Sequence, residues 1–243
     1  MRKSQIAVLS AIAAFALVIV AAIVAARIIV AQIGTGEYAD EPRVTRSDAA
    51  ASSSPDLMGF DRIDARGTWE IDLVQGASWD VELEYPENLE EKMRVSVVGD
   101  RLILDYDRPG WSWWRDRDDG VAARITMPAL ESVDLSGAAQ LDIAGFNGEE
   151  LEIRVSGAAE IDGRNSRYVA LDLTVSGAGD VNLGDAVFTD AHIVVSGAGD
   201  ILLNLDGGVL SGTISGAGKV RYRGSVREQS IVASGFSTVE AAN

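Results

Sequence analysis

The sequence has no cysteine and a single histidine, His192, among its 243 residues. The lack of cysteine excludes disulfides, thiolate metal sites, a cysteine nucleophile and a lipidated N-terminal cysteine. A lone histidine excludes metal sites built from several histidines, and a Ser-His-Asp triad would have to use His192. Because His192 directly precedes the apolar Ile193 in a strand-like stretch, we expect it to face solvent. We therefore predict no catalytic residue, no metal and no cofactor.

Basic residues are scarce as well: 21 Lys and Arg stand against 37 Asp and Glu, a formal net charge of −16. Arg2, Lys3 and Arg27 flank or end the first apolar run, so 18 basic and 37 acidic residues remain after it. A domain this acidic repels nucleic acid, which we exclude as a partner. With 47% hydrophobic residues, the chain can bury one good-sized core.

Charged residues are absent from residues 6–26, where Ser10 is the most polar side chain. As a helix, these 21 residues would be about 31 Å long, close to the hydrocarbon thickness of a bilayer. The alternative is a cleaved signal peptide, whose apolar stretch usually covers only about 7–15 residues. The length of the run favours an uncleaved anchor.

The residues around this run predict how the chain is oriented in the membrane. Arg2 and Lys3 precede it, so residues 1–5 are expected to be a short cytoplasmic tail and residues 6–33 an anchor helix in the inner membrane. The remainder is then extracytoplasmic, in the periplasm. Residues 34–57 show no periodicity and few bulky apolar groups, which predicts a flexible linker.

The second half of the sequence contains a repeat with a fixed period. Ser-Gly recurs six times at steps of 20, 20, 20, 19 and 19 residues, and five copies continue with Ala while the sixth has Phe236. The copies begin at Ser136, Ser156, Ser176, Ser196, Ser215 and Ser234. A fixed period near 20 indicates one structural unit that is repeated and stacked on its neighbours.

Two columns of apolar residues accompany the repeat. The residue before each Ser is Leu135, Val155, Val175, Val195, Ile214 or Ala233. The residue five positions after each Ser is Leu141, Ile161, Val181, Ile201, Val220 or Val239. Most are β-branched and alternate with polar residues, as in strands with one buried face. Glycine is expected at each turn for its backbone angles, Ala for a tight corner, and the Ser hydroxyls as a hydrogen-bonded ladder.

These columns predict an all-β fold, a single-stranded right-handed parallel β-helix (β-solenoid) with about 20 residues per coil, which follows one N-terminal transmembrane helix. The solenoid is expected over residues 58–243. Residues 58–130 are predicted to form irregular N-terminal coils and a cap, and residues 131–243 the regular Ser-Gly repeats.

Several segments together resemble the GIN-domain family, which is described as an auto-transporter adhesin head. The resemblance covers about residues 58–242 and lies in Leu73-Val74-Gln75-Gly76, Pro86-Glu87-Asn88-Leu89, Pro128-Ala129-Leu130, the Ser-Gly-Ala-Gly series and the segment from Gly216 to Gly224. It implies a parallel β-helix in a bacterial envelope protein without an established biochemical activity. It supplies no catalytic residues.

A tryptophan-rich loop, residues 108–120, is the candidate binding site. It contains Trp111, Trp113, Trp114 and Arg115. Aromatic rings mixed with arginine suit stacking on sugar rings, cation–π contacts or a protein hot spot. The alternative is that the tryptophans fold back and cover an open end of the solenoid.

An acidic column is the second candidate. The residues four positions after each Ser are Gln140, Glu160, Asp180, Asp200, Lys219 and Thr238. Three acids stacked one strand apart could hold a cation, whereas a solvated corner in which Lys219 relieves the repulsion is the simpler interpretation.

The predicted function is a non-enzymatic interaction, adhesion or structural module of the bacterial cell envelope, whose partner is an unknown envelope protein or glycan. The alternative is a carbohydrate-active or glycan-binding β-helix protein that uses loop 108–120. Carbohydrate-active β-helix enzymes usually carry long loops and clustered acids and bases on one face. The repeats here leave almost no room for loops.

Overall fold

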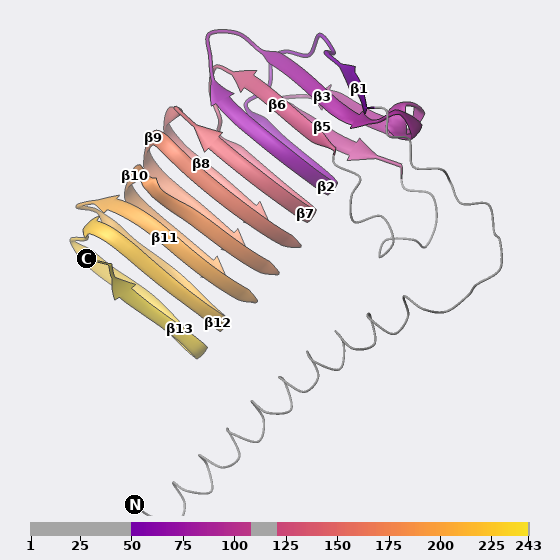
Figure 1. Ribbon diagram of the computed structural model, residues 1–243. Helices are drawn as coiled ribbons and strands as arrows, with labels where there is room; N and C mark the ends of the chain where they lie inside the picture. The colour runs from indigo at the N-terminus through magenta and orange to yellow at the C-terminus, as the bar shows by residue number, and fades with distance from the viewer. Residues whose placement is uncertain (1–49, 108–120, 243) are drawn as a thin grey trace, which may run out of the picture. The chain divides into compact units, whose positions relative to one another are not determined.

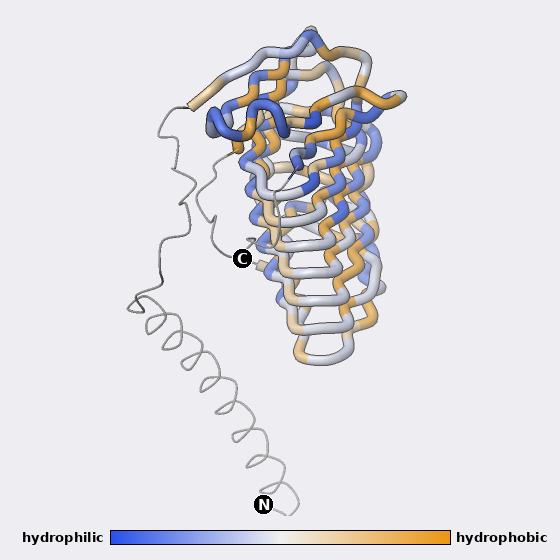
Figure 2. Tube along the Cα trace, turned by 90° about the vertical axis from the view of Figure 1, so that its right-hand side faces the viewer, coloured by the Kyte–Doolittle hydropathy of each residue, from blue (hydrophilic) through white to orange (hydrophobic). Residues whose placement is uncertain are grey.

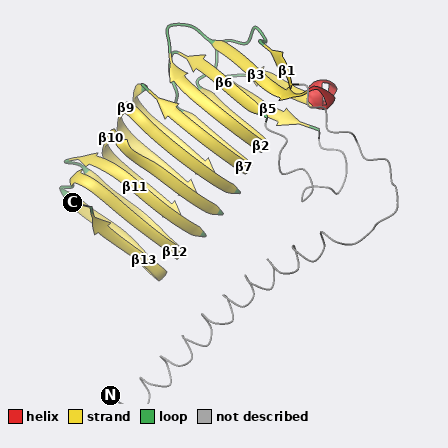
Figure 3. Cartoon of the chain, viewed as in Figure 1, coloured by secondary structure: helices red, strands yellow, loops and turns green. Residues whose placement is uncertain are grey.

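The structure is a computed structural model that describes residues 50–107 and 121–242 (Figure 1). Strands make up nearly all of this part, and its one helix is the short η1 (Figure 3). The elements are β1 (Ala50–Ser53), β2 (Arg62–Gln75), β3 (Asp80–Pro86), η1 (Glu87–Lys92), β4 (Met93–Val98), β5 (Arg101–Tyr106), β6 (Ala122–Met127), β7 (Ser132–Ala144), β8 (Asn147–Val155), β9 (Ala158–Val175), β10 (Ala178–Val195), β11 (Ala198–Asp206), β12 (Val209–Ser225) and β13 (Glu228–Ala241).

Strands β7 to β13 pair in parallel, coil upon coil, which confirms the predicted all-β parallel solenoid. Val155, Val175 and Val195 are register partners on successive coils and are at most 1% exposed. The second apolar column is equally buried from Leu141 to Val220. In Figure 2 the hydrophobic positions recur at the same place on successive coils, and the buried residues show that they form the core. One continuous core therefore runs through the solenoid.

The turn glycines are required chiefly by the close approach of stacked backbones, which differs from the reason expected from the sequence. A Cβ placed on Gly157, Gly177, Gly197 or Gly216 would lie 1.9 Å from the carbonyl oxygen of the glycine one coil earlier. Among the six Ser-Gly glycines, a left-handed φ occurs only at Gly137 and Gly235. Sterics between coils, more than backbone angle, exclude a side chain here.

The serine ladder forms as predicted. The hydroxyl of Ser176 donates to the carbonyl oxygen of Val155 at 3.2 Å, and Ser215 and Ser234 make the equivalent contact to the preceding coil at 3.4 Å. Each hydroxyl thereby binds the backbone of the apolar column residue below it.

Strand β2 is a regular coil that the sequence repeat does not reveal. Gly67 pairs with Gly137, and Ile71 and Leu73 pair with Leu141 and Ile143. Residues 76–131 are inserted between this coil and the next. The predicted irregular region thus contains one coil that continues the regular stack.

The inserted strands add antiparallel pairs at the N-terminal end of the stack. Strand β3 pairs antiparallel with β6, and β4 with β5, while β5 and β6 pair in parallel with β2. Strand β1 pairs antiparallel with β3, so Ala50–Ser53 forms a strand within the segment 34–57 expected to be a linker. Backbone hydrogen bonding to an open strand edge requires no bulky apolar side chain, which is why the composition of this segment did not reveal the strand.

The predicted anchor, residues 6–33, lies outside the described residues. Within residues 50–107 and 121–242, no helix is long and apolar enough to span a bilayer.

Candidate functional site: a groove along the coil turns

A groove of about 940 Å³ runs along the stack beside the Ser-Gly turns. Its lining is Thr68, Trp69, Glu70, Val121, Ala138, Ala139, Gln140, Ala158, Ala159, Glu160, Ala178, Gly179, Asp180, Ala198, Gly199, Asp200 and Ala217. Each coil from β2 to β11 contributes the three residues that follow its turn glycine. The lining of the groove therefore has the same period as the coils. At ~4.8 Å per strand, the five steps from Thr68 to Ala217 make it about 24 Å long.

Small side chains keep the groove open. The exposed alanines 138, 158, 178, 198 and 217 form its floor in one column, and the neighbouring column contains only Ala and Gly. At the N-terminal end, the column changes to Trp69, whose Nε1 donates to the carbonyl oxygen of Arg66 at 2.9 Å. Trp69 packs edge-on against Tyr106, with ring centroids 5.8 Å apart. Large aromatic side chains therefore bound the groove at this end.

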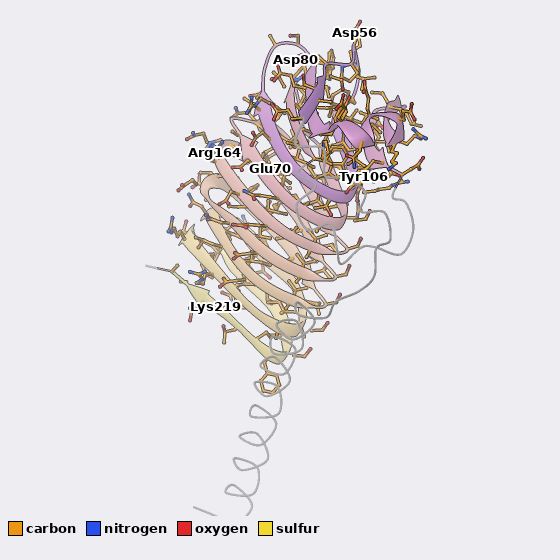
Figure 4. All side chains as sticks on the ribbon, turned by 45° about the vertical axis from the view of Figure 1, so that its right-hand side comes forward. Asp56, Glu70, Asp80, Tyr106, Arg164 and Lys219 are labelled. Carbon is orange, nitrogen blue, oxygen red and sulfur yellow. The ribbon has the colours of Figure 1, made fainter. Side chains whose placement is uncertain are left out.

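Carboxylates line one side of the groove. Glu70, Glu160, Asp180 and Asp200 belong to one register column, with Gln140 between the first two, and all of them are exposed. Figure 4 shows Glu70 and Lys219 at opposite ends of the stack. Lys219 ends the acidic column and lies 2.6 Å from Glu240, and Asp200 accepts a hydrogen bond from Arg221 at 2.8 Å. The predicted acidic column is therefore the polar wall of a groove.

A second acidic column lies two residues further along the same strands, hence on the same face of the sheet. Asp72, Asp142 and Asp162 are register partners. Arg164 lies 2.5 Å from Asp142, and the side chain of Asn182 donates to Asp162 at 2.9 Å. In the sequence this column is visible as Asp six positions after Ser136 and Ser156, and the strand register shows that it lies beside the first acidic column.

Within the described residues, no three or more His, Asp or Glu side chains are arranged to hold a metal ion. The carboxylates of the two columns instead point outward as neighbours along the stack, and several are bound by arginine or amide side chains.

His192 is exposed, as strand alternation predicted. Its Nδ1 lies 3.1 Å from the hydroxyl of Ser211 on the next coil. The nearby Asp190 accepts a hydrogen bond from the backbone N–H of Val209 at 2.7 Å. Asp190 therefore holds the turn before β12, and His192 takes part in a polar contact between coils.

The candidate residues Trp111, Trp113, Trp114 and Arg115 lie outside the described residues. The described chain resumes at Val121, which is 1% exposed and lines the N-terminal end of the groove.

A group of charged residues lies where β2, β5 and β7 begin. Partial burial, together with the carboxylates of Glu131 and Asp100, raises the pKa of Asp61 above its ordinary value, while Arg62 lowers it. The Arg62 guanidinium lies 3.2 Å from Glu131 and 3.5 Å from Asp100, so it is shared among several acids. The ionised Asp61 carboxylate is therefore a net cost to the fold.

Known proteins share this architecture. The chain is similar to a crystal structure titled "putative adhesin" from Bacteroides fragilis NCTC 9343, with a TM-score of 0.64 and 19% identity over 81% of this chain and 99% of that one. A second "putative adhesin", from Parabacteroides distasonis ATCC 8503, gives a TM-score of 0.50 and 15% identity over 81% and 98%. At these identities the likeness shows a shared fold. No curated protein matches the chain.

A family model provides the assignment. The model described as "Putative auto-transporter adhesin, head GIN domain" matches residues 59–188, more than half of the chain, and includes β2 and the coils up to β10. This agrees with the resemblance found in the sequence motifs. The chain belongs to the GIN-domain family.

Proposed function

We propose that this chain is a non-enzymatic interaction or adhesion module of the bacterial cell envelope. In this proposal residues 6–33 anchor it in the inner membrane and the solenoid is displayed outside the cytoplasm. The family description and the adhesin titles of similar structures support an interaction role. The apolar run and the preceding Arg2 and Lys3 support the anchor.

The observation that carries the proposal is the groove. It is built on stacked strands, a rigid scaffold, and its floor offers apolar contact along about five strand steps. Its carboxylate wall would attract positive charge. An extended polypeptide segment of about seven residues, at ~3.3 Å per residue, matches its length. We therefore propose that the groove binds an extended, cationic segment of an envelope protein.

A direct test uses a fluorescent oligolysine peptide of about eight residues and the full chain in detergent, with binding followed by anisotropy. Binding should weaken as salt screens the carboxylates. Ala178→Trp fills the groove floor without changing charge, so it should weaken binding at least tenfold. The matched control His192→Trp places the same bulk on an exposed position outside the groove and should bind like the wild type.

The control separates groove binding from general attraction to an acidic protein. Equal binding by the Ala178→Trp and wild-type chains would contradict the groove as the site. Oligoglutamate should not bind, and binding of that peptide would contradict the role of the carboxylate wall.

Glycan binding is the second candidate, because Trp111, Trp113 and Trp114 suit stacking on sugar rings, and Val121, where the described chain resumes, lines the groove. Replacing Trp111, Trp113 and Trp114 by Ala should abolish capture of purified cell-wall polymers while leaving the melting temperature nearly unchanged. If the tryptophans cover the solenoid instead, the triple variant should lose several kcal/mol. Iodide quenching of tryptophan fluorescence gives a first measurement, because only exposed rings are quenched readily.

The anchor is tested separately. A reporter fused to the C-terminus should be active only outside the cytoplasm, and the mature protein should retain residue 6. A mature N-terminus near Arg27 would replace the anchor by a signal peptide.

A further inference from the structure

Within residues 50–107 and 121–242, strand β13 (Glu228–Ala241) leaves one long backbone edge without a partner strand. Strand β13 is the last in the sheet order and pairs only with β12 among the described strands (Figure 1). It is 14 residues long, whereas the terminal strands at the other end, β1 and β4, have four and six residues. Native proteins usually blunt such edges with Lys, Pro, bulges or short strands. Strand β13 contains neither Lys nor Pro.

Apolar side chains are concentrated on the same strand. Phe236 is 80% exposed and Val232 is 66% exposed. Phe236 occupies the column in which every other Ser-Gly copy has Ala, so bulk appears only at the last coil. Ile231 and Val239 pack against the core but remain partly exposed, and among the described residues no strand lies against their outer side. An unpaired backbone edge thus coincides with uncovered apolar side chains.

We propose that this edge pairs with the same edge of a second copy, which joins two solenoids end to end about a two-fold axis at Gly235. A two-fold axis makes the two β13 strands antiparallel. Pairing about Gly235 then places Ile231 opposite Val239 of the other copy, which brings two core residues together on the inner side. If the two-fold axis passed between two residues instead, each side chain that faces the core would lie opposite a side chain of the other copy that faces solvent.

This register is also compatible in charge and size. Glu240 lies opposite Ser230, so no two acids oppose each other. The two Phe236 rings become diagonal neighbours on one face, a separation that aromatic side chains can bridge. Two copies cannot join head to tail with the same pairing, because β1 and β4 offer only short edges at the N-terminal end.

The size of the surface predicts a weak dimer. Strand β13 bends over the Ser234-Gly235 turn, so about seven of its 14 residues, or ~23 Å at ~3.3 Å per residue, lie in each sheet, and two sheets ~10 Å apart give an end face of roughly 230 Å². Stable interfaces bury about 800 Å² per partner. The dimer therefore belongs to the weak class and should dissociate on dilution.

The mass of the full chain in detergent, measured by analytical ultracentrifugation between about 1 and 100 µM, tests the proposal. The wild type should shift from monomer to dimer over this range. The Val232→Lys and Phe236→Lys double variant places positive charge at two exposed positions of the edge, which disfavours strand pairing. It should therefore stay monomeric with an unchanged melting temperature. A wild type that is monomeric throughout, or a double variant that still dimerises, would overturn the proposal.

Cysteine crosslinking tests the register, since the natural chain has no cysteine. Co-expressed Ser234→Cys and Phe236→Cys chains should form a disulfide-linked pair, because these residues are opposite each other about Gly235. Ser196→Cys, at the equivalent turn in mid-stack, is the matched control and should not crosslink. Crosslinking at residue 196 would indicate side-by-side association. Protection of the β13 amides from hydrogen exchange in the monomer would indicate that residues 1–49 cover the edge. Either result overturns the end-to-end dimer.

Discussion

Substitution of a turn glycine should be far more damaging than its small change in volume suggests. In Gly197→Ala the new Cβ would lie 1.9 Å from the carbonyl oxygen of Gly177 and 2.9 Å from its carbonyl carbon. Because non-bonded heavy atoms in proteins approach to ~3.5 Å, the two coils would have to separate by about 1.5 Å. The oxygen of Gly177 also accepts from the N–H of Ala198 at 2.9 Å, and that separation would break the bond.

The expected cost is about 2–6 kcal/mol of unfolding free energy. Overpacking accounts for about 1–3 kcal/mol, and the lost backbone hydrogen bond with its unsatisfied carbonyl for about 1–3 kcal/mol more. Urea denaturation followed by circular dichroism measures this as a lowered midpoint.

Gly199→Ala is the matched control in the same turn. Its Cβ would meet nothing closer than the Cγ1 of Val195 at 3.5 Å, which is ordinary contact. Because the substitution restricts the unfolded chain, it should be neutral or stabilise by about 0.4–1 kcal/mol. Equal stability of the Gly197→Ala and Gly199→Ala variants would refute the argument that close backbone approach selects glycine at position 197.

Three further predictions concern burial, hydrogen bonding and charge. Val195→Asp places an unpaired charge in the stacked core and should cost several kcal/mol in urea denaturation, whereas Glu160→Ala on the exposed column should be nearly silent. Tyr168→Phe removes the hydroxyl that donates to the carbonyl oxygen of Leu130 at 3.0 Å, so the free energy of unfolding should fall by about 1–3 kcal/mol; an unchanged urea midpoint would show that this bond is dispensable. Because the pKa of Asp61 is raised in the folded state, its contribution to stability is present below the unfolded pKa and is lost as pH rises through the folded pKa. Asp61→Asn should therefore be the more stable chain at pH 7, with the difference disappearing near pH 4, and a less stable variant at pH 7 would contradict the sign.

The repeat made most of the solenoid predictable, because its period is expressed in adjacent copies. Val155, Val175 and Val195 were aligned from sequence alone and are stacked on neighbouring strands. The coil of β2 escaped the same reasoning for two physical reasons. Its turn reads Arg66-Gly67-Thr68, which lacks the Ser and Ala, and 69 residues separate the two glycines that pair, Gly67 and Gly137.

The candidate site was only partly predictable. The carboxylate column was recognised, but a column in an alignment gives no depth, so the groove beside it became visible only once the Ala and Gly columns had a three-dimensional surface. Likewise, Asp142 and Asp162 recur in the sequence, yet their position on the same face as Glu160 follows from strand alternation combined with the observed register.

The floor and the wall of the groove have different physical origins. Stacking accounts for the glycines that flank the floor, since a Cβ on Gly177 or Gly197 would lie 1.9 Å from a carbonyl oxygen of the preceding coil. Stacking does not account for the wall. Like charges on neighbouring strands destabilise a sheet, and Glu160 and Asp180 are register partners with no ion-pair partner among the described residues. If Glu160→Gln and Asp180→Asn together raise the unfolding midpoint and weaken oligolysine binding, the carboxylates serve recognition at the expense of stability; a lowered midpoint would assign them to the fold.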